Sequence, residues 1–528
     1  MHSITAMKTI RIIASLFLLA SIARGEEPKI KVLIVDGFSN HDWRHTTECV
    51  EALLLESGLC EVTVTTAPVK DAAKLAQWRP EFPRYDVVVQ NCNSLGSNYR
   101  WPEPVRADLE AYVRGGGGLF VLHSGNNSFA DWPEYDRMIG LGWRKADQGV
   151  ALEINDGQVV RIPAGRGGGT GHGPRSELLV RKLTEHPINH GYPVTWRTPD
   201  IELYAYARGP AENLTVLSYA SKKEGDKQWP IEWVVNYGKG RVYNGTFGHI
   251  WHDRRQPESC QCVGFQTTLV RAVQWLAGRE VTYPIPANFP TAEHVSLRPF
   301  ELKYRPAEGW ESLFNGQNLD GWTVRCRPDD KDKAFWKVAD GAIECDSLGR
   351  PEHDYVWLEA NKGYADFQLR LKFQAFKSSK GNSGVQFRSR YGDGWLDGPQ
   401  VDVYPPDPLR TGLIYDETTG VRRWIYPSLP DSRMVREKAP ASAQATRLVY
   451  ADDDPAAWNT LELVADGTKV TTFVNGLRVA DFNGAGILDD RVHADRQVGM
   501  AGKILLQLHT RDELRIRFKD LWIRTLTP

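Results

Sequence analysis

The first half of the chain alternates apolar runs with helical patterns. Continuous apolar runs at Ile30–Asp36, Tyr85–Asn91 and Leu119–His123 are typical of parallel strands covered on both faces. One helical pattern follows the first run and another spans Pro104–Arg114. This order predicts a doubly wound, parallel α/β sheet. Gly115–Gly118 follow a helix and precede a strand, so they predict a helix stop, because a phosphate-binding loop would follow a strand.

The second half consists of short strands without helices. Phe367–Phe376 alternates strictly, Asn475-Gly476 is a strong two-residue hairpin signal, and Ile504–His509 and Leu514–Arg524 close the chain. This pattern predicts an antiparallel β-sandwich or jelly roll. Five prolines in the intervening stretch predict an extended connector. We therefore expect an α/β domain at 29–282, a linker at 283–307 and a β-sandwich domain at 308–526.

Polar side chains share one face of the strands in Gly381–Pro406 and Ile504–His509. Because side chains alternate with a period of two, that face carries Gln386, Arg388, Gln400, Asp402, Gln507 and His509. Tyr391 and Trp395 edge it, and Asp393, Asp397 and Glu417 lie in loops. Amides, one guanidinium and one carboxylate beside aromatic rings suit a sugar. We expect this face to contact a carbohydrate.

Histidines collect at the strand ends of the first domain, the edge where open α/β sheets bind ligands. The residues predicted to form a site there are His41, Asp42, Trp43, His45, His123, Asn126 and His249. A single histidine is more often a satisfied hydrogen-bonding residue. Several at one edge leave two interpretations open: a small-molecule or sugar-processing site, and a purely structural or docking role. His172, in the glycine-rich stretch Gly165–Gly173, lies in either a lid or a plain loop, and we favour the loop.

Composition restricts the partners and the compartment. The 528 residues carry 65 basic and 66 acidic side chains, so the net charge of −1 does not indicate a nucleic-acid partner or an anionic membrane surface. Lys8 and Arg11 precede the apolar run Ile12–Ala20, which is too short to span a bilayer. We expect a signal peptide cleaved near Ala23–Gly25 and a periplasmic or secreted protein that is not integral to the membrane.

Seven cysteines in an exported chain allow disulfides and leave at least one thiol unpaired. Cys326 and Cys345 are expected on neighbouring strands and could pair, and Cys49 with Cys60 is the weaker pairing. Cys260-Gln-Cys262 lacks a second cysteine pair, which disfavours a metal site there.

The motifs of the first half resemble the ThuA-like (trehalose-utilisation) family. They are NHDW…TT at Asn40–Thr47, GGGGLFVLHSGNNSFADW from Gly115, ELYAYARGPAEN from Glu202 and YGKGRVYNGTFGH ending at His249. The resemblance implies a fold like class I glutamine amidotransferases, and it adds Glu202 to the expected site. In those enzymes a cysteine occupies a strand-to-helix elbow. Here His123 stands at that position, so glutaminase chemistry is not expected.

The second half resembles the 3-keto-disaccharide hydrolase family, which has a concanavalin-like jelly-roll fold. The motifs include LFNGQNLDGW at Leu313–Trp322, GNSGVQFRS at Gly381–Ser389, Thr411–Tyr415 and GKILLQLH from Gly502. The resemblance adds Tyr415 to the substrate-binding residues. Gly398 stands where the family usually has a carboxylate, which leaves that role to Asp402 or to no residue. The stretch Tyr426–Tyr450 is longer than usual and has no explanation from the sequence.

The resemblance implies cleavage of 3-keto-glycosides by base catalysis. A ketone at C3 acidifies the C2 proton, so one base can remove it while the C1 substituent leaves. We expect His509 or Asp402 as the base, and Arg388 with Gln400 as binders of the enolate and hydroxyl oxygens. A divalent metal held by Asp402 and His509 would polarise the ketone; no other cofactor is expected. The alternatives are a lectin-like domain that binds sugar without turnover and a scaffold role.

Overall fold

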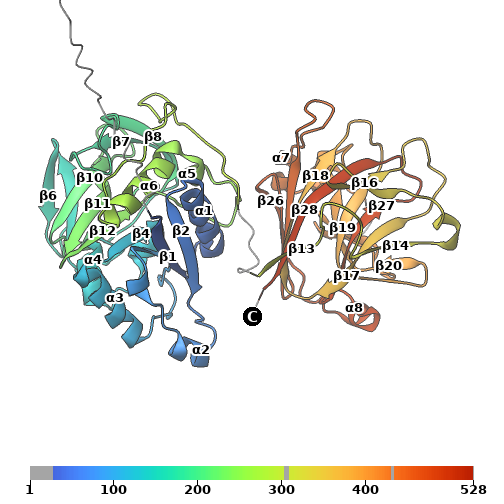
Figure 1. Cartoon of the computed structure of the whole chain (residues 1–528), viewed down its shortest axis with the longest axis horizontal. Coiled ribbons are helices and arrows are strands. Elements are labelled where there is room, and N and C mark those ends of the chain that lie inside the picture. Colours follow the sequence, from blue (N-terminus) through green and yellow to red (C-terminus); the bar gives the residue numbers. More distant parts are fainter. Residues whose placement is uncertain (1–27, 303–308, 430–432, 527–528) are drawn as a thin grey trace, which may run out of the picture.

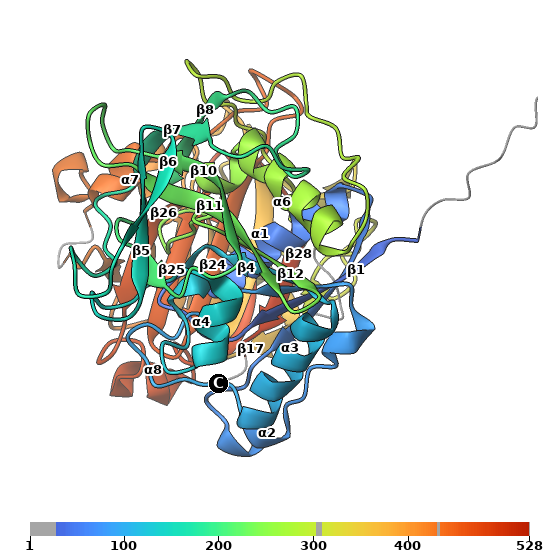
Figure 2. The ribbon, with the colours of Figure 1, turned by 90° about the vertical axis from the view of Figure 1, so that its left-hand side faces the viewer.

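Two domains lie side by side in the computed structural model, which describes residues 28–302, 309–429 and 433–526 (Figure 1). Figure 2 views the molecule from the side of the first domain, with the sandwich behind it. The expected signal peptide lies outside the described residues. Among the helices of the described ranges, none is both long enough and apolar enough to cross a membrane.

A nine-stranded mixed sheet forms the first domain, in the order β2-β1-β3-β4-β12-β11-β10-β7-β8. The strands are β1 (Ile30–Asp36), β2 (Cys60–Thr66), β3 (Val87–Gln90), β4 (Gly118–Leu122), β7 (Ser176–Lys182), β8 (Thr195–Ile201), β10 (Leu214–Ala220), β11 (Trp229–Tyr237) and β12 (Gly240–Gly245). A small second sheet pairs β6 (Gln158–Ile162), β5 (Val150–Asn155) and β9 (Arg208–Gly209).

The sequence predicted a parallel sheet, but only five neighbouring strands of the nine pair in parallel. The strands β2, β1, β3, β4 and β12 pair in parallel, whereas β11, β10, β7 and β8 continue the sheet antiparallel. Only Gly238 and Lys239 separate β11 from β12. Two residues suffice for a hairpin but not for the crossover that a parallel pair needs, so the direction must reverse there.

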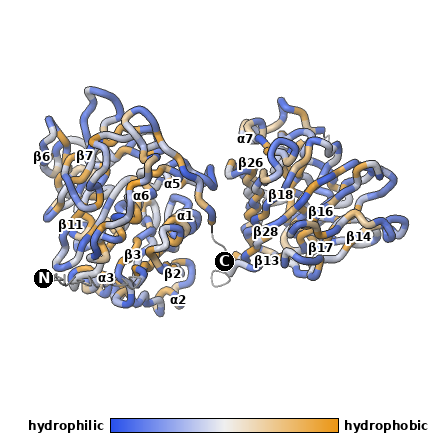
Figure 3. Tube along the Cα trace, turned by 45° about the horizontal axis from the view of Figure 1, so that its top comes forward, coloured by the Kyte–Doolittle hydropathy of each residue, from blue (hydrophilic) through white to orange (hydrophobic). Residues whose placement is uncertain are grey.

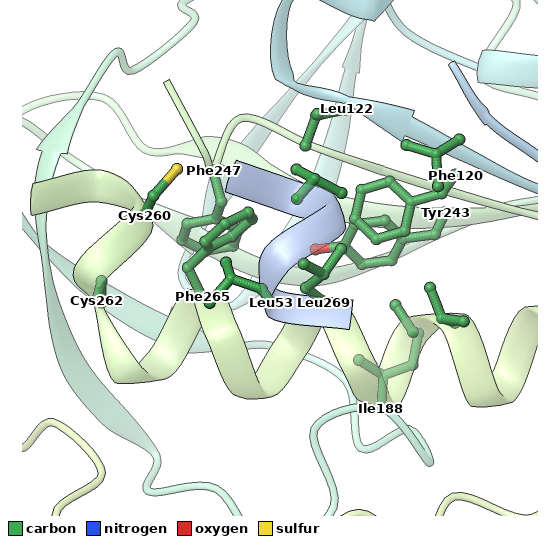
Figure 4. Packing of buried hydrophobic residues seen from close by; sticks show 14 of the residues in the cluster. Leu53, Phe120, Leu122, Ile188, Tyr243, Phe247, Cys260, Cys262, Phe265 and Leu269 are labelled. Carbon is green, nitrogen blue, oxygen red and sulfur yellow. The ribbon is translucent and has the colours of Figure 1, made fainter. Parts of the chain in front are cut away.

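Helices cover both faces of this sheet. The α-helices in the described ranges are α1 (Trp43–Glu56), α2 (Ala72–Gln77), α3 (Glu103–Gly115), α4 (Pro133–Ile139), α5 (Glu258–Gln261), α6 (Val263–Leu276), α7 (Ala441–Ala445) and α8 (Arg491–Arg496). On one face Leu53 of α1 and Leu269 of α6 pack near Phe120 and Tyr243 of the strands (Figure 4). The other face buries α3 and α4. Burial on both faces explains the continuous apolar strands.

The second domain is the predicted antiparallel sandwich. One sheet runs β15-β16-β28-β18-β24-β25-β26, with β13 beside β28, and the other runs β14-β17-β27-β19-β21-β22-β23, with β20 beside β19. The first contains β13 (Trp310–Ser312), β15 (Trp336–Ala339), β16 (Ala342–Asp346), β18 (Phe367–Ala375), β24 (Asn459–Asp466), β25 (Lys469–Val474), β26 (Leu477–Asn483) and β28 (Arg515–Thr525). The second contains β14 (Trp322–Cys326), β17 (Val356–Tyr364), β19 (Ser383–Gly392), β20 (Trp395–Asp397), β21 (Pro399–Val403), β22 (Ile414–Asp416), β23 (Arg423–Tyr426) and β27 (Gly502–Leu508). Apolar side chains from both sheets form the core between them, and hydrophobic stretches follow the strands in Figure 3.

The connector lies against the first domain over its described part. Phe289 and Phe300 are buried in that domain's core, and Leu297 forms an isolated bridge with Cys262. No helix or strand is assigned between 282 and 302, which agrees with the extended connector expected from the prolines.

The two domains meet through backbone contacts at a predicted hairpin. The Asn475-Gly476 turn joins β25 to β26, as expected. The Arg255 amide donates to the Gly476 carbonyl at 2.8 Å, and the Arg478 amide donates to Asp253 at 3.2 Å. The loop after β12 is therefore held by the sandwich.

Buried charges complete this interface. The Arg255 guanidinium lies 2.5 Å from Asp42 Oδ2 in its own domain and 2.8 Å from Glu462 Oε1 on β24. Arg370 of β18 bridges Glu462 and Glu48 of α1, at 2.8 and 2.7 Å. This network of ion pairs holds the two domains in one orientation. Removing one of its members would leave a buried charge without its partner and would destabilise the interface.

All seven cysteines are free thiols, so neither of the pairings that the sequence allowed is formed. Cys326 is on β14 and Cys345 on β16, and these strands belong to opposite sheets of the sandwich. Cys49 and Cys60 are both buried and unpaired. Period-two patterns assign strands but not the sheet to which each belongs, and this is why the expected pairing failed.

Candidate functional sites

A pocket of about 390 Å³ opens on the outer face of the sandwich sheet that contains β19, β21 and β22. It is lined by Tyr355, Asn382, Gln400, Asp402, Arg410, Tyr415, Glu417, Trp424, Arg433, Met434 and His509. Four of the residues that the sequence predicted meet here: Gln400, Asp402, Tyr415 and His509. Aromatic rings, amides and charged groups around such a volume fit a small polar ligand.

Asp402 is the centre of a buried hydrogen-bond network. Its Oδ1 accepts from Asn382 Nδ2 at 2.9 Å and from Gln400 Nε2 at 3.0 Å. Its Oδ2 accepts from Arg410 Nε at 3.0 Å. The Gln386 amide in turn donates to Gln400 Oε1. Asp402 therefore orients the amides and the guanidinium of the pocket wall.

His509 and Glu417 are the titratable pair of this pocket. His509 Nδ1 lies 3.2 Å from Asp512 Oδ2, and its Nε2 lies 2.9 Å from the Tyr355 hydroxyl. Burial alone would lower the pKa of His509, but the hydrogen bond and charge of Asp512 and the charge of Glu417 raise it on balance. Burial raises the pKa of Glu417 to about 7, against the opposing charge of His509. Both groups can exchange protons near neutral pH.

Arg388 does not reach this pocket. Its guanidinium is fully buried and donates to Asp366 at 2.8 Å and to the carbonyls of Ala365, Gly467 and Gly499. The residue has a φ of 51°, and the pairing of β19 with β27 shifts register between Gln386 and Ser389. This bulge breaks the alternation that had placed Arg388 beside Gln386. The expectation that it belongs to the polar face is corrected.

The other predicted sugar contacts lie beneath or beside the pocket. Gln386 and Gln507 are fully buried. The Tyr391 hydroxyl donates to the Cys326 carbonyl at 2.9 Å, and Trp395 Nε1 donates to the Glu417 carbonyl at 3.0 Å. These two aromatic residues pack around Trp357 at the edge of the sheet. Tyr391 and Trp395 therefore support the wall of the pocket from outside it.

Sequence reasoning missed much of the lining. Tyr355, Asn382, Arg410 and Trp424 carried no expectation, and Glu417 counted only as a loop carboxylate. The unexplained stretch Tyr426–Tyr450 packs against Trp424 through Leu429 and α7, and it contributes Arg433 and Met434 to the pocket. Its unusual length was the one available signal that it builds part of the site.

A metal held by Asp402 and His509 fits this pocket poorly. Both carboxylate oxygens of Asp402 already accept hydrogen bonds from three donors. His509 Nε2 faces the Tyr355 hydroxyl. The chemistry of this pocket is therefore derived below from its own acids and bases.

Four of the eight residues predicted for the site of the first domain converge. His41, His123, Glu202 and His249 are buried, and one side-chain ligand atom of each lies within 4.8 Å of the others. His123 follows β4 with a φ of 41°, a strained backbone that a non-glycine residue adopts at few sites. Four groups from separate loops meet at the edge that the sheet rule predicted.

The other four predicted residues, His45, Asp42, Trp43 and Asn126, lie outside this cluster. His45 faces the domain boundary. Its Nδ1 lies 3.2 Å from Glu48 and its Nε2 2.8 Å from the Arg255 carbonyl. Asp42 caps α1 and pairs with Arg255, and Trp43 begins the helix. Asn126 lies buried behind the cluster, 3.3 Å from Asn244. His172 lies at the margin, with its Nε2 3.6 Å from Glu202.

Two family models match the chain. The model described as trehalose utilisation (ThuA) matches residues 31–276, and the one described as a 3-keto-alpha-glucoside-1,2-lyase-like domain matches residues 309–524. No curated protein matches the chain.

Solved structures resemble each half separately. A protein described as ThuA-like from Parabacteroides merdae is 30% identical, with 51% of this chain and 98% of that chain covered and a TM-score of 0.48. A protein described as a glycosyl hydrolase from Parabacteroides distasonis is 19% identical, with 42% and 96% covered and a TM-score of 0.28. The carbohydrate-binding module CBM66 from Bacillus subtilis is 12% identical, with 41% and 96% covered and a TM-score of 0.23.

The fold and the family matches define a two-domain carbohydrate-processing protein, with an α/β domain joined to an antiparallel sandwich. Its first domain belongs to the trehalose utilisation (ThuA) family, and its second matches the model of a 3-keto-alpha-glucoside-1,2-lyase-like domain.

Proposed function

We propose that the second domain of this exported protein cleaves 3-keto-glycosides by elimination followed by hydration. The observation that carries the proposal is that His509 and Glu417 line the same polar pocket, where burial raises the pKa of Glu417 to about 7. The family match supports the choice of a ketone-bearing sugar.

His509 is the base in this mechanism. Asp512 holds the proton on Nδ1, so Nε2 carries the lone pair. This lone pair lies on the pocket side of the ring, next to the Tyr355 hydroxyl. Nε2 takes the C2 proton, and the C2–H electrons form an enolate whose charge rests on the C3 oxygen. The Arg410 guanidinium lines the pocket and is held in its wall by the bond to Asp402, so it supplies the positive charge that stabilises this oxygen.

Glu417 is the acid. The enolate collapses to a C1–C2 double bond, the C1–O bond breaks, and the departing oxygen takes the Glu417 proton. Water then adds at C1 and gives its proton to the Glu417 carboxylate, while the His509 imidazolium returns a proton to C2. The net reaction is hydrolysis, and both groups end in their starting states.

The test is release of the leaving group from a synthetic 3-keto-glucoside by the full chain, beside the matched unoxidised glucoside. We expect turnover of the keto sugar alone and loss of about 10²–10⁴-fold in rate on His509→Ala. Asp402→Ala should raise KM by misplacing the amides it holds. His190→Ala is the control, since the His190 side chain is exposed and pairs with Glu185 at the surface.

Wild-type rates in both variants would refute the mechanism. Binding of keto and native sugars in calorimetry without any turnover would instead favour the lectin-like alternative. Loss of catalysis on addition of a chelator would instead support the metal ion predicted at Asp402 and His509.

A further inference from the structure

The histidine cluster of the first domain has the spacing of a metal site. Glu202 Oε1 lies 3.3 Å from His249 Nε2, and Glu202 Oε2 lies 3.6 Å from His123 Nε2. Ligands held about 2.0–2.1 Å from a tetrahedral zinc ion lie roughly 3.3 Å from one another. The pairs with Glu202 already match this spacing. The full set, within 4.8 Å, needs only a small inward shift.

The ring nitrogens are oriented as metal ligands. His41 Nδ1 lies 3.0 Å from Asn40 Oδ1, and His123 Nδ1 lies 2.8 Å from the Thr246 carbonyl. Both acceptors require the proton on Nδ1, so each Nε2 carries a lone pair. The Nε2 atoms of His41, His123 and His249 are buried without a hydrogen-bond partner. Lone pairs facing a carboxylate are stabilised by a cation.

We propose that His41, His123, Glu202 and His249 bind a divalent transition metal such as Zn²⁺. Three imidazoles with one carboxylate favour zinc, iron, nickel or copper over calcium and magnesium, which prefer oxygen ligands. The site lies in the other domain from the proposed sugar cleavage and stands independently of it.

The cleft between the domains gives access to the site. His41 and Trp251 both line this cleft, which has a volume of about 430 Å³. The Trp251 ring packs across those of His41 and His249, with centroids 5.1 and 6.3 Å away. A metal would therefore enter beside Trp251, from the cleft that the sandwich helps to form.

The test uses the full chain, stripped with chelator, dialysed and reloaded with Zn²⁺ or Co²⁺. We expect about one metal ion per chain by elemental analysis, and visible Co²⁺ absorption typical of four-coordinate nitrogen and oxygen ligation. His123→Asn and Glu202→Gln should each lose both signals. Asn40→Ala, which removes the partner of His41 Nδ1, should weaken binding roughly 10–100-fold. His190→Asn is the control and should bind as the wild type does.

Circular dichroism shows whether each variant is folded, and Glu202→Gln serves if His123→Asn is not. Metal content and Co²⁺ spectra unchanged in a folded ligand variant would overturn the proposal. So would a wild-type chain that holds no metal after reloading.

Discussion

Glu48 of α1 and Arg370 of β18 form an ion pair across the domain boundary, with Oε2 2.7 Å from Nη2 and both side chains at most 10% exposed. The other carboxylate oxygen of Glu48 lies 2.8 Å from Arg524 of β28. Burial would raise the pKa of Glu48, but these two guanidinium groups hold it well below its usual range. One carboxylate of the first domain thus compensates two cations of the second, the buried Arg370 and the partly buried Arg524.

Replacing Glu48 by Ala should destabilise the chain strongly. The change leaves Arg370 and Arg524 buried without that partner, which costs about 3–5 kcal/mol in comparable pairs. We expect denaturant unfolding to split into two transitions, because the domains lose their coupling. Glu81→Ala, which removes an exposed pair with Arg84, should leave the curve unchanged. A single unshifted transition in Glu48→Ala would show that the network does not couple the domains.

Glu417→Gln should discriminate between leaving groups. Loss of an acid slows departure of a poor leaving group, such as a sugar hydroxyl, by about 10²–10⁴-fold but leaves an activated phenol nearly unaffected. In the wild type the rate should fall as pH rises through about 7, where Glu417 loses its proton. That limb should vanish in the variant. Glu185→Gln at the surface is the matched control, and equal losses for both leaving groups would exclude the acid role.

Gly384→Ala should distort the pocket by displacing the Gln400 side chain that lies against this glycine. A Cβ at Gly384 would fall 2.2 Å from Gln400 Cδ, so the amide that donates to Asp402 must move. We expect a raised KM for the keto sugar and a stability loss of about 1–3 kcal/mol. Gly392→Ala in the same strand meets nothing within 4 Å and should be silent. An unchanged KM would show that Gln400 does not contact substrate.

Glu232 makes the stability of the first domain depend on pH. Burial raises its pKa to about 7, against hydrogen bonds from Ser218 and Tyr243. The folded state binds this proton more tightly than the unfolded state, so the stabilisation is full below about pH 4 and lost as pH rises to 7. Glu232→Gln should remove roughly 3 kcal/mol of this dependence. Parallel unfolding profiles of variant and wild type between pH 5 and about 8 would contradict it.

Arg388→Lys should weaken the fold and leave catalysis intact. A lysine cannot reproduce the planar fork that reaches Asp366 and three carbonyls at once. We expect a lower melting temperature with an unchanged KM per folded molecule. A changed KM at full stability would return Arg388 to the binding surface.

The sequence predicted those features that depend on periodicity and topology. Alternation placed Gln400 and Asp402 on one outer face, and the strand-end rule brought His41, His123 and His249 to one edge. It failed at Arg388, because a bulge inserts an extra residue without a sequence signal. It failed at His45, because the first turn of α1 directs that ring to the domain boundary.

Loop residues were beyond such reasoning. Glu417 follows β22, and its place beside His509 depends on how β22 pairs with β21 in a sheet closed by distant strands. The opposite-sheet positions of Cys326 and Cys345 have the same origin. Which strands become neighbours is decided by packing across the whole sandwich, and no local pattern records it.

The loop that contains Trp251 and Arg255 makes contacts with both domains. At one end it covers the histidine cluster, and at the other it hydrogen-bonds the Gly476 turn of the sandwich. A chain divided at the connector would leave this loop without its outer support. The two halves are thus poor candidates for separate expression, although each matches its own family. A fusion of the first domain to a different partner would also have to include the hairpin that holds this loop.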